Sequence, residues 1–453
     1  MKKLLIREDG HVGKFRVFLL VLVVLVMIFV ASTLTISVRY QISPYFTANL
    51  IVRQAFLSVV DASTFIYDPS STQKALLGPD TGKQQGYLPV EEFPRKADLG
   101  EHIRVKEISN EKIKRSRFDF SYQTYEEPRL AELRKEYKLD DVVAPGRDEF
   151  EAMVLLRNWA RSQFRRDDYQ PLMKNFNALE VLRKNVRNVR NEPHKITQYR
   201  PCIFFPLFYL QILLSMGYQA RLICISHLED QGYNGHGITE VWSNQFRKWV
   251  TMDADLNLHY ERDGIPLNAL EVHNERYRVN PSNIKIIRTV QNSGDNEHLK
   301  EIKLGEMIDY HSYIQIVDMR NDLLTNHYFR GHPKRSEGSR LSWVDEKLPK
   351  VFDLKPKTSN PDDFYWTLNQ TEIWTKKEMG GEKAVPLVFK TFTPNYSHFE
   401  IWLDDSKKIS SEDPIFIWEL HSGRNKLLVQ SVNKFGIHGI PSFVEISVDK
   451  ALQ

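Results

Sequence analysis

Cysteine is almost absent from this sequence of 453 residues, which contains only Cys202 and Cys224. The low count excludes the disulfide framework that stabilises many small secreted domains, although the two cysteines could still form one bridge. The net charge of +4 is small for the length and does not indicate a nucleic acid partner. The sequence also has no zinc-type cysteine spacing, no RNA-binding signature and no glycine-rich phosphate loop. It therefore predicts no nucleic acid partner, no metal and no cofactor.

The composition is that of a globular protein, with 42% hydrophobic and 26% charged residues. A chain of this length exceeds one ordinary hydrophobic core, so two or three domains are expected. No internal repeat and no low-complexity tract occurs in the sequence. The domain boundaries are therefore predicted from changes in hydrophobic pattern.

One long apolar run stands near the N-terminus, from Val17 to Ile36. Twenty helical residues rise roughly 30 Å, about the thickness of the hydrocarbon core of a bilayer. Basic residues precede the run at Lys2, Lys3, Arg7, Lys14 and Arg16. By the positive-inside rule, the sequence predicts a cytoplasmic tail over 1–16, a single-pass membrane anchor over 17–37 and an extracytoplasmic remainder. A cleaved signal peptide is the alternative, but the run is long for one and no clear cleavage site follows.

The region 38–125 predicts a stalk followed by irregular and β structure. Residues 38–60 could continue the helix as an amphipathic stalk, and prolines and glycines cluster from Asp68 to Gly100. Within 102–125, the segments HIRVKEI and RFDFSYQTY are typical of short strands or a hairpin.

Residues 126–290 predict an α+β domain in which helices come first and antiparallel strands second. Helices are expected over 130–139, 148–164 and 171–190. In the second of these, Arg157 interrupts the apolar face. The run from Cys202 to Met216 is nearly all apolar and predicts a buried helix. Three short strands should follow it, the last two joined in a hairpin, at 220–226, 237–243 and 248–254.

Beyond residue 290 the pattern becomes β-rich. A connecting region is expected over 291–360, and 361–453 predicts a C-terminal β-sandwich of immunoglobulin-like size. Candidate strands that alternate apolar and polar residues are 313–319, 364–368, 386–392, 398–403, 414–420, 426–433 and 442–448. Four tryptophans of this region could form a sugar platform, although aromatic residues in strands usually belong to the core. They are Trp366, Trp374, Trp402 and Trp418.

Three stretches in the middle of the chain supply the groups of a cysteine–histidine–aspartate site. Cys202 stands where the buried helix begins, and free N–H groups and the helix dipole lower the pKa of a thiol there. His236 begins one strand of the predicted hairpin and Asp253 ends the other, so their side chains can meet. A thiol nucleophile, an imidazole base and a carboxylate that orients the imidazole are the set needed for acyl transfer. Each residue alone has an ordinary structural explanation, and their joint arrangement favours catalysis. Cys224 lies within an apolar strand and is predicted to be a core residue.

On these motifs, residues 148–272 resemble the transglutaminase-like superfamily, which has a papain-type cysteine fold. In that family a cysteine opens a long helix, which ends in glycine and a short strand of the Gly-Ile-Pro-Ala-Arg kind. Here residues 217–221, Gly-Tyr-Gln-Ala-Arg, begin fifteen positions after Cys202. The resemblance covers less than a third of the chain.

The second and third motifs of the family match as well. Its histidine, often followed by glutamate four positions on, is matched by His236 and Glu240. Its tryptophan four positions before aspartate is matched by Trp249 and Asp253. The resemblance implies that Cys202 is the nucleophile, that His236 is base and acid, and that Asp253 orients the imidazole.

The chain also departs from the family pattern. The family usually has glycine two positions before the cysteine, where this chain has Arg200, and tryptophan two positions after the histidine, where it has Ile238. The first change could alter how substrate approaches the thiol, and the second could alter the wall of the cleft. Besides the N–H of Cys202, an oxyanion donor is not evident, and Gln198 and Tyr199 are candidates by proximity alone. Basic residues recur from Arg157 to Arg190 and either line a solvated helix face or meet an anionic polymer.

The sequence thus predicts an α+β protein with an N-terminal transmembrane helix, a papain-like transglutaminase-type core and a C-terminal immunoglobulin-like β-sandwich. Its expected activity is thiol acyl transfer on a peptide or protein amide, by hydrolysis or by crosslinking. By analogy, the architecture suggests a role in bacterial cell-envelope or exopolysaccharide metabolism. Two alternatives stay open: a strict peptidase, and a non-catalytic papain-like scaffold that binds a polysaccharide or peptide partner.

Overall fold

The computed structural model of the protein describes residues 74, 76–80, 86–92, 103–164, 177–183, 202–229, 232–289, 305–325, 340–345, 356–376 and 384–449. The predicted cytoplasmic tail (1–16), the anchor (17–37) and the stalk (38–60) lie outside these residues. In the part of the chain that the structure describes, no helix has the length and apolar character needed to cross a bilayer.

A six-stranded sheet with the order β11-β10-β9-β3-β4-β5 forms the central domain. Its strands are β3 (Ala220–Glu229), β4 (Gly232–Ser243), β5 (Lys248–Met252), β9 (Tyr313–Ile316), β10 (Leu341–Trp343) and β11 (Lys357–Thr358). Neighbours pair antiparallel except β10 and β11. The predicted hairpin is confirmed as β4–β5, and its turn holds Arg247 at a positive φ of 53°. Strands β9 to β11 come from the range 291–360 that was expected to be a connection.

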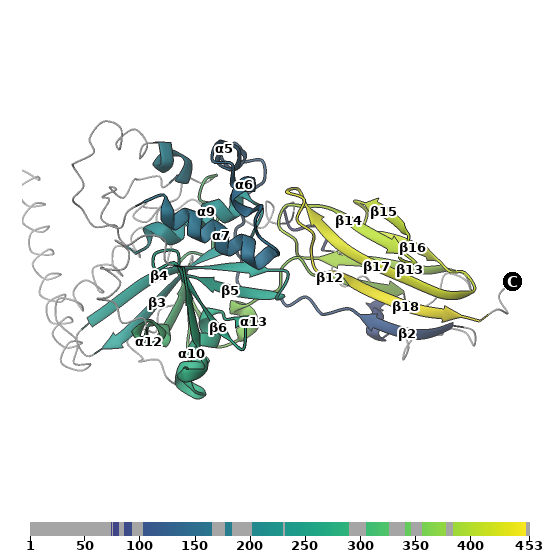
Figure 1. Ribbon diagram of the computed structural model, residues 1–453. Helices are drawn as coiled ribbons and strands as arrows, with labels where there is room; N and C mark the ends of the chain where they lie inside the picture. The colour runs from purple at the N-terminus through teal and green to yellow at the C-terminus, as the bar shows by residue number, and fades with distance from the viewer. Residues whose placement is uncertain are drawn as a thin grey trace, which may run out of the picture.

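Helices gather on one side of this sheet, where α9 packs directly against β3 and β4 (Figure 1). They are α5 (Pro128–Glu136), α6 (Leu139–Val143), α7 (Glu149–Ser162) and α9 (Phe204–Ser215). Every residue of α9 is buried, as its apolar run predicts. The helix ends at Gly217, whose φ of 91° is a left-handed conformation that favours glycine. The fold is therefore a mixed α+β arrangement, as predicted.

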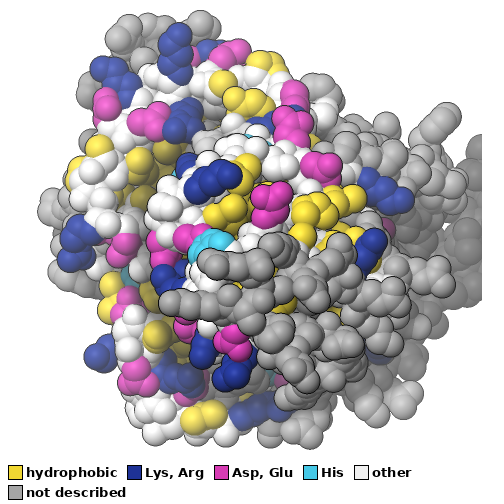
Figure 2. Space-filling view, turned by 90° about the vertical axis from the view of Figure 1, so that its right-hand side faces the viewer, with side chains coloured by type: hydrophobic (Ala, Val, Ile, Leu, Met, Phe, Trp, Pro, Cys, Tyr) yellow, Lys and Arg dark blue, Asp and Glu magenta, His cyan; other side chains and the backbone are white. Residues whose placement is uncertain are grey.

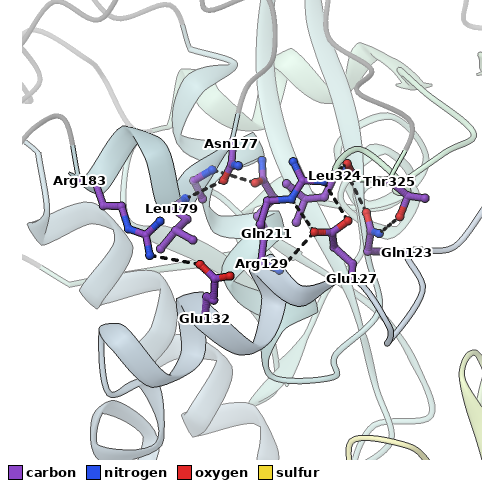
Figure 3. A network of polar contacts seen from close by, with 11 residues as sticks. Gln123, Glu127, Arg129, Glu132, Asn177, Leu179, Arg183, Gln211, Leu324 and Thr325 are labelled. Atoms are coloured by element: carbon purple, nitrogen blue, oxygen red, sulfur yellow. Dashed lines mark hydrogen bonds and ion pairs between the residues drawn. The ribbon is translucent and has the colours of Figure 1, made fainter.

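The predicted helix over 171–190 is described only over 177–183, of which residues 178–183 are helical. This segment is attached to α9 and α5 by polar contacts (Figure 3). The side-chain carbonyl of Gln211, fully buried on α9, accepts a hydrogen bond of 2.9 Å from the Ala178 N–H. Arg183 forms an ion pair of 3.2 Å with Glu132 on α5. The contacts fix the segment on the helical side of the domain.

A second, three-stranded sheet with the order β7-β6-β8 continues from β5. Its elements and the short helices around it are β6 (Leu258–Arg262), β7 (Ile265–Pro266), α10 (Ala269–Arg278), a 3-10 turn (Pro281–Asn283), β8 (Lys285–Arg288), α12 (Glu306–Asp309) and a 3-10 turn (Tyr310–Ser312). Helix α10 begins with a capping box made by Asn268 and Glu271. The tight turn from β5 into β6 carries Asp253.

The C-terminal part is a sandwich of two antiparallel sheets that share one apolar core, beside the central domain (Figure 1). One sheet contains β1 (Tyr87–Pro89), β12 (Thr371–Lys376), β13 (Ala384–Thr391) and β16 (Ile415–Glu419). The other contains β2 (Ile103–Ser109), β14 (Tyr396–Leu403), β15 (Lys407–Ser411), β17 (Gly423–Asn433) and β18 (Ser442–Val448). The 3-10 turn Val90–Glu92 follows β1. Strands β1 and β2 precede the helices in sequence. The sandwich therefore combines strands that come before the central domain in the chain with strands that come after it.

Two predicted strands are wrong. Residues 364–368 form no strand, because the short helix α13 (Pro361–Phe364) begins at a proline capped by Asn360 and an irregular segment follows it. In the segment 117–125, one isolated bridge joins Ser121 to Arg320, and no strand forms. In both segments the apolar residues pack around the central sheet instead of pairing in a ladder.

The tryptophans and the basic run divide between core and surface. Trp366 and Trp418 are buried in the cores. The other two each lie beside a lysine, with Lys390 Nζ 3.5 Å from the ring centre of Trp374 and Lys408 Nζ 5.2 Å from that of Trp402. In the basic run, Arg157 and Arg161 are buried, so the prediction of a solvated helix face is wrong for these two residues.

Candidate active site

Cys202 lies in the turn that leads into α9, two positions before the first helical residue. Its thiol is partly buried, and Sγ lies 3.7 Å from the carbonyl oxygen of Gly235 on β4. The N–H of Gly237 donates a hydrogen bond to the same sulfur. The N-terminus of the helix and this backbone donor both stabilise negative charge on sulfur.

Gly237 permits the close approach of α9 to β4. A Cβ atom at this position would lie 3.2 Å from the Cα atom of Ile203 and 3.5 Å from the carbonyl oxygen of Cys202. Strand β5 pairs with β4 only as far as Thr239, so the backbone of β4 at 235–237 is open to the turn that carries the thiol. The helix can therefore place its first turn beside His236.

His236 and Asp253 form a buried pair. Nε2 of His236 lies 2.7 Å from Oδ2 of Asp253, and the carboxylate is fully buried. Oδ1 of Asp253 accepts a hydrogen bond of 2.9 Å from the N–H of Leu256, which holds the carboxylate in the tight turn. A hydrogen bond joins the imidazole to the thiol of Cys202. Because Nε2 is bound to the carboxylate, Nδ1 is the ring nitrogen left for the sulfur.

The electrostatics of the pair favour a charged thiolate and imidazolium. Burial by itself lowers the pKa of His236, but the charge and hydrogen bond of Asp253 outweigh it and raise that pKa well above its ordinary value. Burial by itself raises the pKa of Cys202, but the hydrogen bond and charge of His236 and the N–H of Gly237 together lower it. The structure thus brings the three predicted residues into one hydrogen-bonded chain.

The other motif residues have structural roles. Arg221 and Glu240 form a fully buried ion pair, with Nη2 2.6 Å from Oε2. The indole N–H of Trp249 donates a hydrogen bond of 2.9 Å to the carbonyl of Trp366. The Arg221 guanidinium lies 4.2 Å from the ring centre of Trp249. This cluster fixes β3, β4 and β5 relative to one another, and so sets the distance between the ends of the hairpin that carry His236 and Asp253.

The sequence did not indicate two groups next to the triad. Tyr310 packs against the imidazole of His236, with ring centres 6.4 Å apart. Asp255 adds negative charge that raises the pKa values of both Cys202 and His236. The position of Asp255, two residues after Asp253, is the feature of the sequence that could have indicated it.

Ile238 is fully buried, and therefore does not form an open cleft wall. Cys224 is partly buried and packs against the apolar core of the central domain, next to the predicted core position. The oxyanion candidates Gln198 and Tyr199, and Arg200, lie outside the described residues.

No family model matches the chain, and no curated protein matches it either.

Proposed function

We propose that this protein is a cysteine acyltransferase or hydrolase of the transglutaminase-like, papain-type kind. One observation carries the proposal: a thiol at the start of α9 is hydrogen-bonded to an imidazole whose Nε2 lies 2.7 Å from a fully buried carboxylate. Nucleophile, base and orienting group are then arranged as acyl transfer requires. The triad consists of Cys202, His236 and Asp253.

The reaction begins with the thiolate of Cys202 attacking the carbonyl carbon of an amide. The imidazolium of His236 gives its proton to the leaving amine as the carbon–nitrogen bond breaks, and a thioester remains on Cys202. Water or a primary amine then loses a proton to His236 and attacks the thioester. The sulfur leaves as thiolate, with a carboxylic acid or a new amide as product. Asp253 keeps the imidazole oriented and stabilises its positive charge in both steps.

The broader architecture belongs to the same proposal. The central domain serves as a papain-like core, the C-terminal sandwich as an immunoglobulin-like module, and residues 17–37 as an anchor that places both outside the cytoplasm. The substrate is a peptide or protein amide. The protein acts in the cell envelope, where a polysaccharide is available as a partner. The face of the molecule in Figure 2 carries acidic and basic side chains interspersed with apolar ones.

An activated ester tests the acyl-transfer chemistry without knowledge of the natural substrate. Full-length protein in detergent is mixed with p-nitrophenyl acetate, and nitrophenolate release is followed. We expect a burst of about one equivalent per protein, because acylation of an activated thiol precedes slower thioester hydrolysis. Mass spectrometry should locate the acetyl group on Cys202.

Two cysteine variants provide the matched controls. Cys202→Ala should lose the burst, whereas Cys224→Ala should keep it, since the proposed mechanism gives Cys224 no role. A burst that persists in Cys202→Ala, or equal acetylation of both cysteines, would contradict the proposal.

A further inference from the structure

Arg157 is a fully buried cation on α7, at a position where the helix should present an apolar residue. Burial lowers its pKa to about 10, so the guanidinium remains charged at neutral pH. A buried charge is costly unless an opposite charge and hydrogen bonds offset it. The hydrogen-bond and charge partners of Arg157 therefore indicate the role of this buried cation.

The hydrogen bonds of Arg157 all go to the chain segment that carries Asp253. Its Nε donates to Oδ1 of Asn257 at 3.0 Å, and Nη1 lies 3.4 Å from the sulfur of Met252. The same Nη1 lies 3.0 Å from Nδ1 of His259. Met252 ends β5, Asn257 lies in the turn and His259 lies in β6, so these partners flank Asp253 on both sides in the sequence. Arg157 thus holds the turn from outside, while the carboxylate points toward His236.

None of these three partners supplies a negative charge. Asn257 and Met252 are neutral, and burial together with the Arg157 charge lowers the pKa of His259 to about 4. Its Nδ1 therefore accepts from Arg157, and Nε2–H donates to Glu261 at 2.9 Å. Among the described residues, Nη2 of Arg157 has no hydrogen-bond partner.

The charge that acts on Arg157 comes from the triad. Tyr209 on α9 and Asp253 at the end of β5 both interact electrostatically with the guanidinium. Burial raises the pKa of Tyr209, so its hydroxyl is neutral at physiological pH. Asp255 lies nearby, its backbone carbonyl accepting a 3.0 Å hydrogen bond from Arg161. Of the groups that act on Arg157, Asp253 is thus the one that is ionised.

We propose that Arg157 is a positioning residue of the acyl-transfer site, which counters the charge of Asp253 and fixes the turn that aims this carboxylate at His236. The inference rests on the proposed function. Arg157 would then influence both the conformation of the turn that carries Asp253 and the pH range over which the Cys202 thiolate exists.

Arg157→Met tests the charge. Loss of a nearby cation raises both apparent pKa values of the thiol–imidazole pair, so the acid limb of Cys202 alkylation by iodoacetamide should move upward by about half to one pH unit. Arg157→Lys keeps the charge and loses the fork of hydrogen bonds. Arg157→Lys should leave the acid limb of Cys202 alkylation at the same pH, even if it lowers the melting temperature of the protein. A purely structural arginine would give the same limb in both variants.

Asn257→Asp gives a second route if Arg157→Met fails to fold. The aspartate is nearly isosteric and would neutralise Arg157 from its Nε side, so the limb should again move upward. An unshifted limb in a folded Arg157→Met or Asn257→Asp protein overturns the inference. If the wild-type chain shows no acid limb below about pH 7, where a free thiol is still protonated, the proposed function has failed instead.

Discussion

Replacing Arg221 by methionine is expected to lower the free energy of unfolding by about 3–5 kcal/mol, because it leaves a buried carboxylate without its counter-ion. Arg221 and Glu240 are both fully buried, and the guanidinium also donates to the carbonyl of Phe364. Four aromatic rings also surround the guanidinium. Their centres lie 4.2 Å away for Trp249, 4.8 Å for Trp366, 4.9 Å for Tyr365 and 5.4 Å for Phe364. Denaturant unfolding of the full-length chain in detergent measures the loss.

The double variant Arg221→Met with Glu240→Gln should recover part of this loss. Glutamine removes the charge but keeps a carbonyl for the N–H of Ala269 and the hydroxyl of Tyr365, which donate to Glu240 at 2.8 Å and 3.1 Å. Arg104→Met is the surface control, since Arg104 is largely exposed, and should change stability by less than about 1 kcal/mol. If Arg221→Met costs no more than Arg104→Met, the pair does not hold the three strands together.

Asp253→Asn is expected to lower the rate of Cys202 alkylation between about pH 5 and pH 8 by roughly 10- to 100-fold. The thiolate exists in this range only when the proton resides on His236. Burial alone disfavours that imidazolium, and the carboxylate charge raises its pKa. With a neutral amide, the uncharged thiol and imidazole become the dominant form, and thiolate appears only as the thiol itself titrates, near pH 8.5.

The rate of iodoacetamide labelling against pH measures this change, with Cys224→Ala as background so that only one thiol reacts. Asparagine is nearly isosteric with aspartate, so the turn around residue 253 should be kept. An unchanged plateau in Asp253→Asn would mean that the buried carboxylate does not support the imidazolium.

The triad was predictable because its geometry depends on local elements. A nearly all-apolar run of this length predicts a buried helix, which places Cys202 at a helix N-terminus. Two strand patterns separated by a short turn predict a hairpin, which brings His236 near Asp253. In each case the deciding pattern lies within fewer than twenty consecutive residues.

The rest depended on contacts between distant parts of the chain. Strand β2 pairs with β18 across more than three hundred residues, and nothing in either strand specifies that partner. Residues 364–368 have the alternation of a strand, but they form none, and the rings of Phe364, Tyr365 and Trp366 lie around the Arg221 guanidinium instead. Arg157 interrupted an apolar face in the sequence, and only the folded chain shows that it reaches the turn of Asp253.

The central claim is that Cys202 and His236 form a thiolate–imidazolium pair, and the pH dependence of Cys202 alkylation tests it most directly. Full-length wild type and His236→Ala are labelled with iodoacetamide over a range of pH, and labelling at Cys202 is quantified by mass spectrometry. We expect rapid labelling of wild type on a plateau below about pH 7, and loss of this plateau in His236→Ala. Slow labelling that rises only above about pH 8 and is identical in the two proteins would contradict it.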